Sequence, residues 1–116
     1  MTNEKQNLSV GGKISIAEKS PAFRDATAHI YLEDVSRADA ESNIIAEAKI
    51  ENLDHSDKVT EIPFRLEIAD ASLIDPKRFY SIRVWIETEQ GANDLYSDRA
   101  YRVLTHGFGD YIEIQL

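Results

Sequence analysis

The stretch "IDPKRFYSIRVWIE", residues 74–87, contains the pattern that decides the fold. Asp75 and Pro76 predict a tight turn, after which apolar side chains alternate strictly with a second, mostly polar set of side chains. The apolar set is Tyr80, Ile82, Val84 and Ile86, and the opposite set is Ser81, Arg83, Trp85 and Glu87. A strand with one apolar face is typical of an antiparallel sheet that buries only one side.

Tyr80 opens this strand directly after the corner and faces the predicted core. A core-facing tyrosine at such a corner can bond its hydroxyl to the main chain upstream, as in the tyrosine corner of β-sandwiches. We therefore expect Tyr80 to be buried, with its hydroxyl bonded to the main chain of the corner that Asp75 and Pro76 form. A catalytic phenol is the less favoured interpretation.

The same alternation recurs along the whole chain, with turn residues between the apolar runs. Seven strands are predicted, near residues 8–17, 27–35, 43–51, 59–69, 79–89, 95–104 and 110–116. They predict an all-β, single-domain antiparallel β-sandwich of the immunoglobulin or transthyretin kind over residues 10–116, after an N-terminal tail of residues 1–9. A helix over residues 38–49 is the one rival, but the alternation after Ile44–Ile45 favours a strand.

The apolar faces of these strands predict the core. Its expected members are Ile14, Ile30, Leu32, Ile50, Phe64, Leu66, Ile82, Val84 and Ile112. Pro63 lies inside an otherwise good strand, which predicts an edge strand or a bulge there. The pair Gly11–Gly12 predicts a bulge or a close approach of two backbones.

Composition limits the classes of partner. The chain has 116 residues, no cysteine and a formal net charge of −8. Because the acidic residues are spread evenly, nucleic acid is not an expected partner. No apolar run approaches the roughly 18 residues that a membrane span needs, and the first ten residues lack the apolar segment of a signal peptide. We expect a monomer that does not insert into membranes.

Two groups of side chains could carry chemistry, and both have plainer interpretations. Asp34, Ser36 and Asp39 follow a strand without the spacing of a calcium loop, so we expect them to cap a turn. His29, His55 and His106 fall in separate segments, and we expect solvated imidazoles rather than a zinc site. We therefore predict no catalytic, cofactor-binding or metal-binding residue, and a protein that is not an enzyme.

The polar face of the strand near residues 79–89 is the candidate interaction surface, formed by Phe79, Arg83 and Trp85. An exposed tryptophan beside an arginine has the composition of an interaction hot spot. The alternative is that a neighbouring strand or the N-terminal tail covers Trp85, with Arg83 stacked on its ring.

Five stretches resemble one known family. They are "IYLEDVSRADAESNIIAE" at 30–47, "IPFRLE" at 62–67, "IDPKRFYSIRVWIE" at 74–87, "YSDRAYRVLTHG" at 96–107 and "DYIEIQL" at 110–116. In this order they resemble the YbaY/YscW-like domain, a β-sandwich found in bacterial outer-membrane lipoproteins. The resemblance covers about residues 10–116.

The resemblance implies a non-enzymatic interaction module with a protein or cell-envelope partner and no cofactor. One branch of the family resembles the pilotin-type chaperones of type III secretion, which help a secretin assemble at the outer membrane. The implied location is the outer membrane or periplasm. Because the first ten residues lack the apolar segment of a signal peptide and the sequence contains no cysteine that could carry a lipid, a trimmed chain or a soluble cytoplasmic branch is the alternative expectation. The alternative function is a carbohydrate-binding or carbohydrate-processing sandwich, in which Trp85 stacks on a sugar.

Overall fold

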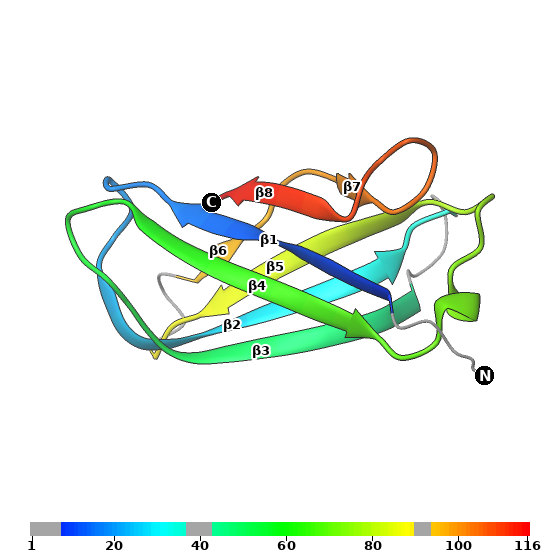
Figure 1. Cartoon of the computed structure of the whole chain (residues 1–116). Coiled ribbons are helices and arrows are strands. Elements are labelled where there is room, and N and C mark those ends of the chain that lie inside the picture. Colours follow the sequence, from blue (N-terminus) through cyan, green and yellow to red (C-terminus); the bar gives the residue numbers. More distant parts are fainter. Residues whose placement is uncertain (1–7, 37–42, 90–93) are drawn as a thin grey trace.

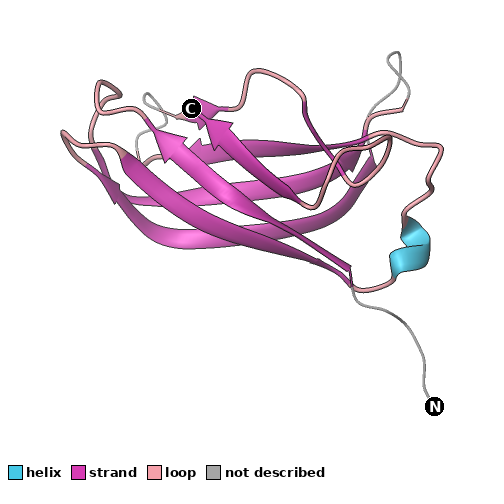
Figure 2. Ribbon diagram, turned by 45° about the horizontal axis from the view of Figure 1, so that its top comes forward, coloured by secondary structure: helices cyan, strands magenta, loops and turns pink. Residues whose placement is uncertain are grey.

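The computed structural model describes residues 8–36, 43–89 and 94–116, and these form two sheets packed face to face (Figures 1 and 2). The three-stranded sheet has the order β4-β1-β8, formed by Thr60–Ile68, Leu8–Ile16 and Tyr111–Gln115. The five-stranded sheet contains β3 (Asn43–His55), β2 (Phe23–Asp34), β5 (Tyr80–Glu87), β6 (Leu95–Tyr96) and β7 (Tyr101–Val103). Its order is β3-β2-β5-β6, and β7 pairs with the other half of β5.

A single short 3-10 helix, η1 (Ala71–Leu73), lies between β4 and β5 in the described part of the chain (Figure 2). No helix among the described residues is long and apolar enough to cross a membrane. Of the predicted N-terminal tail, residues 1–7 lie outside the described residues, and residues 8 and 9 belong to β1.

The core lies between the two sheets and consists of the inward-facing residue of each alternating pair. Seven predicted members are buried: Ile14, Ile30, Leu32, Phe64, Leu66, Ile82 and Val84. The prediction was wrong for Ile50 and Ile112, which are only partly buried. Both residues lie on edge strands, β3 and β8, so each has a neighbouring strand on one side only.

The predicted strand near residues 95–104 is two strands, so the structure has eight strands in the described chain. Ser97 directly follows the first of them, β6. The N–H of Ser97 donates to the carbonyl of Val84, while the Ser97 hydroxyl accepts from the N–H of Val84 at 2.9 Å. Because a side chain takes the place of a backbone partner, the ladder stops there and resumes at Tyr101.

One pairing is parallel, where an entirely antiparallel sandwich was expected: β1 runs parallel to β8 and antiparallel to β4. Gly12 lies where these three strands meet. A Cβ atom at Gly12 would overlap the carbonyl oxygen of Ile112 and lie 2.8 Å from the ring of Phe64. Of the glycine pair, Gly12 therefore marks a close backbone approach. Pro63 lies on β4, an edge strand, as predicted.

Strand β2 begins at Phe23, four residues earlier than expected, because two irregularities hide the alternation. Asp25 and Asn52 both have left-handed backbones, with φ of 55° and 61°. Short polar residues tolerate this conformation best among the non-glycine residues. The side-chain amide of Asn52 donates to the carboxylate of Asp25 at 3.2 Å, and the N–H of Asp25 donates to the carboxylate of Asp54 at 2.9 Å. These hydrogen bonds link the irregular parts of β2 and β3 to each other.

Candidate functional site

The outer face of the five-stranded sheet is the face of β5 opposite Ile82, Val84 and Ile86, which are buried. Two of the three predicted surface residues, Arg83 and Trp85, point to this side. The cross-strand register places His29 of β2 beside Trp85 and Tyr96 of β6 on the other side of it. We call Tyr96, Trp85 and His29 the aromatic row.

The rings of the aromatic row stack on one another. The centroids of His29 and Trp85 are 4.5 Å apart at 19°, and those of Trp85 and Tyr96 are 6.2 Å apart at 1°. Trp85 is partly buried as a result, whereas Tyr96 is 61% exposed. His29 is also fixed by Glu87, whose carboxylate lies 2.9 Å from its Nε2 atom. The row is thus a stacked aromatic strip across three strands.

Arg83 belongs to the next rung of the same face. Its Nε and Nη2 atoms donate to one carboxylate oxygen of Glu33 at 3.0 and 2.8 Å. Its guanidinium lies 4.6 Å from the ring centroid of Tyr31, so the arginine stacks on Tyr31 rather than on Trp85. Glu33 is buried, and its hydrogen bond with Arg83 raises the pKa of the Arg83 guanidinium above its usual value.

Phe79 lies at the other end of this face, six residues before Trp85 and so roughly 20 Å away along the strand. The guanidinium of Arg102 lies 4.6 Å from the Phe79 ring centroid. The imidazole of His106 stacks on the same ring at 3.8 Å and 11°. The structure therefore places Phe79 in a separate group, the Phe79 cluster of Phe79, Arg102 and His106, and does not bring it next to Trp85.

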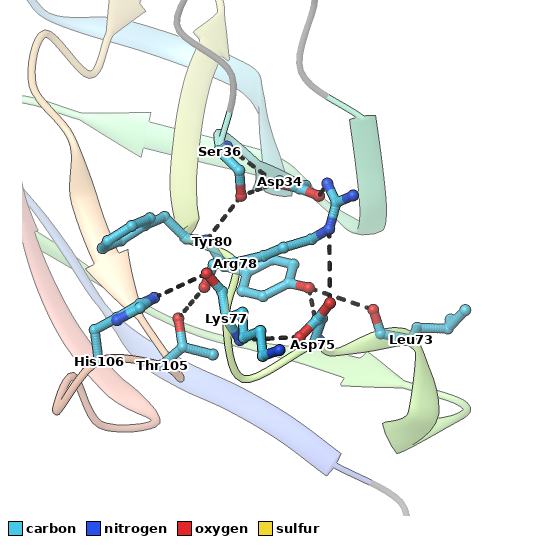
Figure 3. A network of polar contacts seen from close by, with 10 residues as sticks. Asp34, Ser36, Leu73, Asp75, Lys77, Arg78, Tyr80, Thr105 and His106 are labelled. Atoms are coloured by element: carbon cyan, nitrogen blue, oxygen red, sulfur yellow. Dashed lines mark hydrogen bonds and ion pairs between the residues drawn. The ribbon is translucent and has the colours of Figure 1, made fainter.

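Figure 3 shows the corner that positions the Phe79 cluster. Tyr80 is 1% exposed; its hydroxyl accepts a hydrogen bond from the N–H of Asp75 at 2.8 Å and points to the carbonyl of Leu73 at 3.5 Å. The Asp75 carboxylate accepts from the N–H of Lys77 at 2.9 Å, which closes the turn after Pro76. Hydrogen bonds among residues 73–80 thus fix the corner that precedes β5.

Asp34 and Ser36 hold the same corner from β2 (Figure 3). The carboxylate of Asp34 accepts hydrogen bonds from the N–H and the hydroxyl of Ser36 at 3.0 and 2.6 Å. It also pairs with the guanidinium of Arg78 at 2.8 Å. The Ser36 hydroxyl in turn accepts a hydrogen bond from the N–H of Phe79. Partial burial raises the pKa of Asp34, but these hydrogen bonds and Arg78 outweigh it and leave the pKa below its usual value. Asp34 and Ser36 therefore cap the chain at a turn; Asp39 lies outside the described residues.

The histidines are in three different environments. The prediction of a solvated imidazole was wrong for His55, which ends β3, is 3% exposed and has Nδ1 2.7 Å from the hydroxyl of Thr60. This happens because β3 continues past the predicted strand end. His29 stacks in the aromatic row, and His106 is exposed on Phe79. Among the described residues, no three histidine or carboxylate side chains are grouped to hold a metal ion.

Sequence reasoning missed several residues of this face: Tyr31, Glu33, Asp94, Tyr96 and Arg102. The alternation of "HIYLE" does put His29, Tyr31 and Glu33 on one face of their strand. It cannot say which residue of another strand each would meet, because register is a long-range property.

The carboxylate of Asp94 holds the indole of Trp85 in place, which leads to a prediction about the effect of low pH. Its carboxylate accepts from the N–H and hydroxyl of Thr88 at 2.7 and 2.8 Å and from the indole N–H of Trp85 at 3.0 Å. The backbone hydrogen bond from Thr88, with those from Trp85 and the Thr88 hydroxyl, holds the pKa of Asp94 below its usual value. Because the folded-state pKa is depressed, this stabilisation is full above about pH 4 and is lost as the pH falls through the folded pKa.

Trp85 is the one tryptophan of the chain, so its fluorescence reports this change directly. We expect a shift in emission below about pH 4 in the wild type. The shift should be absent in Asp94→Asn and present in Asp34→Asn, the control at the opposite end of the sheet. The same acid transition in Asp94→Asn would contradict the assignment.

Comparison with known proteins agrees with this architecture. The YscW family, described as type III secretion system lipoprotein chaperones, matches residues 5–116. The chain belongs to the YscW family. A solved structure, an alternative pilotin from the type II secretion system of Vibrio cholerae, is similar with a TM-score of 0.74 and 24% identity, over 95% of this chain and 96% of that one. At this identity the likeness establishes a shared fold. No curated protein matches the sequence of this YscW-family chain.

Proposed function

We propose that this YscW-family protein is a non-enzymatic, pilotin-like chaperone of the bacterial envelope that binds a secretin during its assembly. The observation that carries the proposal is the family match over residues 5–116. The similarity in fold to a pilotin of a different secretion system is consistent with it. The contact surface in this proposal is the outer face of the five-stranded sheet.

The two outer faces differ in chemistry, and the difference favours this choice. On the three-stranded sheet, Lys13 forms ion pairs with Glu61 and Glu113, and Arg65 pairs with Glu67. That face also carries the exposed Tyr111, whose hydroxyl donates to the carboxylate of Glu113 at 3.4 Å. The five-stranded sheet instead presents Trp85, Tyr96 and Tyr31 beside Arg83. Tryptophan, tyrosine and arginine are the residues that most often dominate binding energy at protein interfaces.

A carbohydrate-binding role has less support from the geometry. A sugar stacks on an open ring face, but the ring of Trp85 lies between those of His29 and Tyr96, and its indole N–H is already bonded to Asp94. A glycan would have to displace one of these contacts. Tyr96 has the most exposed ring of the row.

The proposal is tested by titrating the purified protein with fragments that tile a secretin from the same bacterium, using calorimetry and amide chemical shifts. We expect one fragment to bind, and Trp85→Ala to weaken it at least about tenfold, as hot-spot truncations do. Arg83→Ala should also weaken binding. The matched control, Arg65→Ala, removes an exposed arginine from the opposite sheet and should leave the affinity unchanged.

Denaturant unfolding of Trp85→Ala separates lost contact from lost fold. Because Trp85 is only partly buried, we expect a cost below the roughly 3–5 kcal/mol of a buried tryptophan. The proposal would be overturned if no fragment bound, or if Trp85→Ala and Arg65→Ala bound alike. Glycan-induced shifts centred on Trp85, without binding of any fragment, would favour the carbohydrate role instead.

A further inference from the structure

The Phe79 cluster contains Arg102, which has no ion-pair partner among the described residues. Four arginines, Arg65, Arg78, Arg83 and Arg99, each lie within ion-pair distance of a carboxylate. Within the described ranges, Arg24 and Arg102 have no such partner. Of these two, Arg102 is the one whose guanidinium lies over an aromatic ring, that of Phe79. A planar guanidinium held on a ring keeps its N–H edge available for a carboxylate.

The backbone beside this arginine is strained. The N–H of Thr105 donates to the carbonyl of Val103 at 2.9 Å around Leu104, whose φ is 76°. This is the rare γ-turn with a positive central φ, and His106 follows with a φ of 57°. Such conformations cost free energy and persist only where surrounding contacts impose them, often at binding sites.

The contacts that impose this turn also place His106 on Phe79. The Thr105 hydroxyl donates to the carbonyl of Arg78 at 2.5 Å, and Nε2 of His106 lies 3.3 Å from the carbonyl of Lys77 (Figure 3). The corner that carries these two carbonyls is itself fixed by Tyr80 and Asp34. The cluster is thus held in one arrangement before any partner arrives, which lowers the entropy cost of binding.

We infer that Arg102, held over Phe79, binds a carboxylate side chain of a protein partner. An apolar side chain of the same partner segment then packs on Phe108, which is 46% exposed on the turn two residues after His106. Exposed Lys77 adds positive charge to this end of the molecule. The inference rests on the proposed function in taking the partner to be a protein, and it adds the chemistry of the segment: an acidic residue beside an apolar one.

An anionic membrane surface is the competing source of negative charge, and the charges disfavour it. Lipid headgroups attract clusters of basic residues, whereas this chain has a net charge of −8. An arginine that stacks on a ring and pairs with no carboxylate of the described chain fits a single carboxylate, and arginine with aromatic residues is typical of protein hot spots.

The test uses the full chain and two short capped peptides, one of alternating leucine and glutamate and one of alternating leucine and glutamine. We expect the glutamate peptide to shift the amide resonances of Phe79, Arg102 and His106, and the glutamine peptide not to. Arg102→Ala should weaken binding of the glutamate peptide at least about tenfold. Arg102→Lys, which keeps the charge and loses the planar fork, should recover part of it. Arg65→Ala is the matched control.

Equal binding of the two peptides, no binding of either, or shifts centred elsewhere would overturn the inference. So would binding to vesicles containing phosphatidylglycerol that Arg102→Ala abolishes. The failure of the inference is distinguishable from the failure of the proposed function, because the peptide test uses no secretin, whereas the proposed function fails when no secretin fragment binds. If a fragment binds but neither Arg102→Ala nor replacement of its glutamates by glutamine weakens it, the inference alone fails. Amide spectra that retain the wild-type dispersion establish that each variant is folded.

Discussion

Gly12→Ala is expected to destabilise the protein by about 3 kcal/mol or more, at the upper end of the cost of overpacking a core. The added Cβ atom would overlap the carbonyl oxygen of Ile112, which is backbone and cannot rotate away, and would press on the ring of Phe64. Relief requires β8 to move from β1, which breaks the parallel pairing. Denaturant unfolding measures the effect as a lower midpoint.

Gly11→Ala is the matched control, because it makes the same substitution one residue earlier on the same strand. Its Cβ would lie 3.4 Å from the carbonyl oxygen of Phe64, at ordinary contact distance. We expect a change within about 0.5 kcal/mol, as for most surface substitutions. Equal stabilities of the two variants would show that β1 and β8 do not approach as closely as the structure has them.

Tyr80→Phe is expected to cost about 1–3 kcal/mol, because the N–H of Asp75 loses the hydroxyl that accepts from it in a partly buried corner. The ring stays in the core, so the loss is that of the hydrogen bond and not of packing. Urea unfolding gives the change in stability, and hydrogen exchange of the Asp75 amide should become faster.

Tyr96→Phe controls for the loss of a phenol hydroxyl. Tyr96 is 61% exposed, and its hydroxyl makes no hydrogen bond within the described chain. Its removal should change stability by no more than about 0.5 kcal/mol. If Tyr80→Phe were as stable as Tyr96→Phe, the hydroxyl of Tyr80 would not hold the corner.

Local patterns were enough wherever each strand met its neighbours regularly. The alternation from Tyr80 to Glu87 placed Ile82 and Val84 inside and Arg83 and Trp85 outside, and the structure has them so. Patterns failed where a local exception breaks the ladder. The hydroxyl of Ser97 interrupts what reads as one strand, and the left-handed Asp25 and Asn52 hide the beginning of β2 and the end of β3.

The face on which Arg83 and Trp85 lie was determined by the sequence alone, because side-chain direction in a strand alternates with every residue. What each of them contacts was decided only by the tertiary structure. The register of β2, β5 and β6 set His29 and Tyr96 against Trp85, and Glu33 and Tyr31 against Arg83. The strained turn after β7 brought His106 to Phe79, with Arg102 of β7 over the same ring. These pairs join residues 11 to 56 positions apart in the chain, and only the packing of whole strands chooses between such partners.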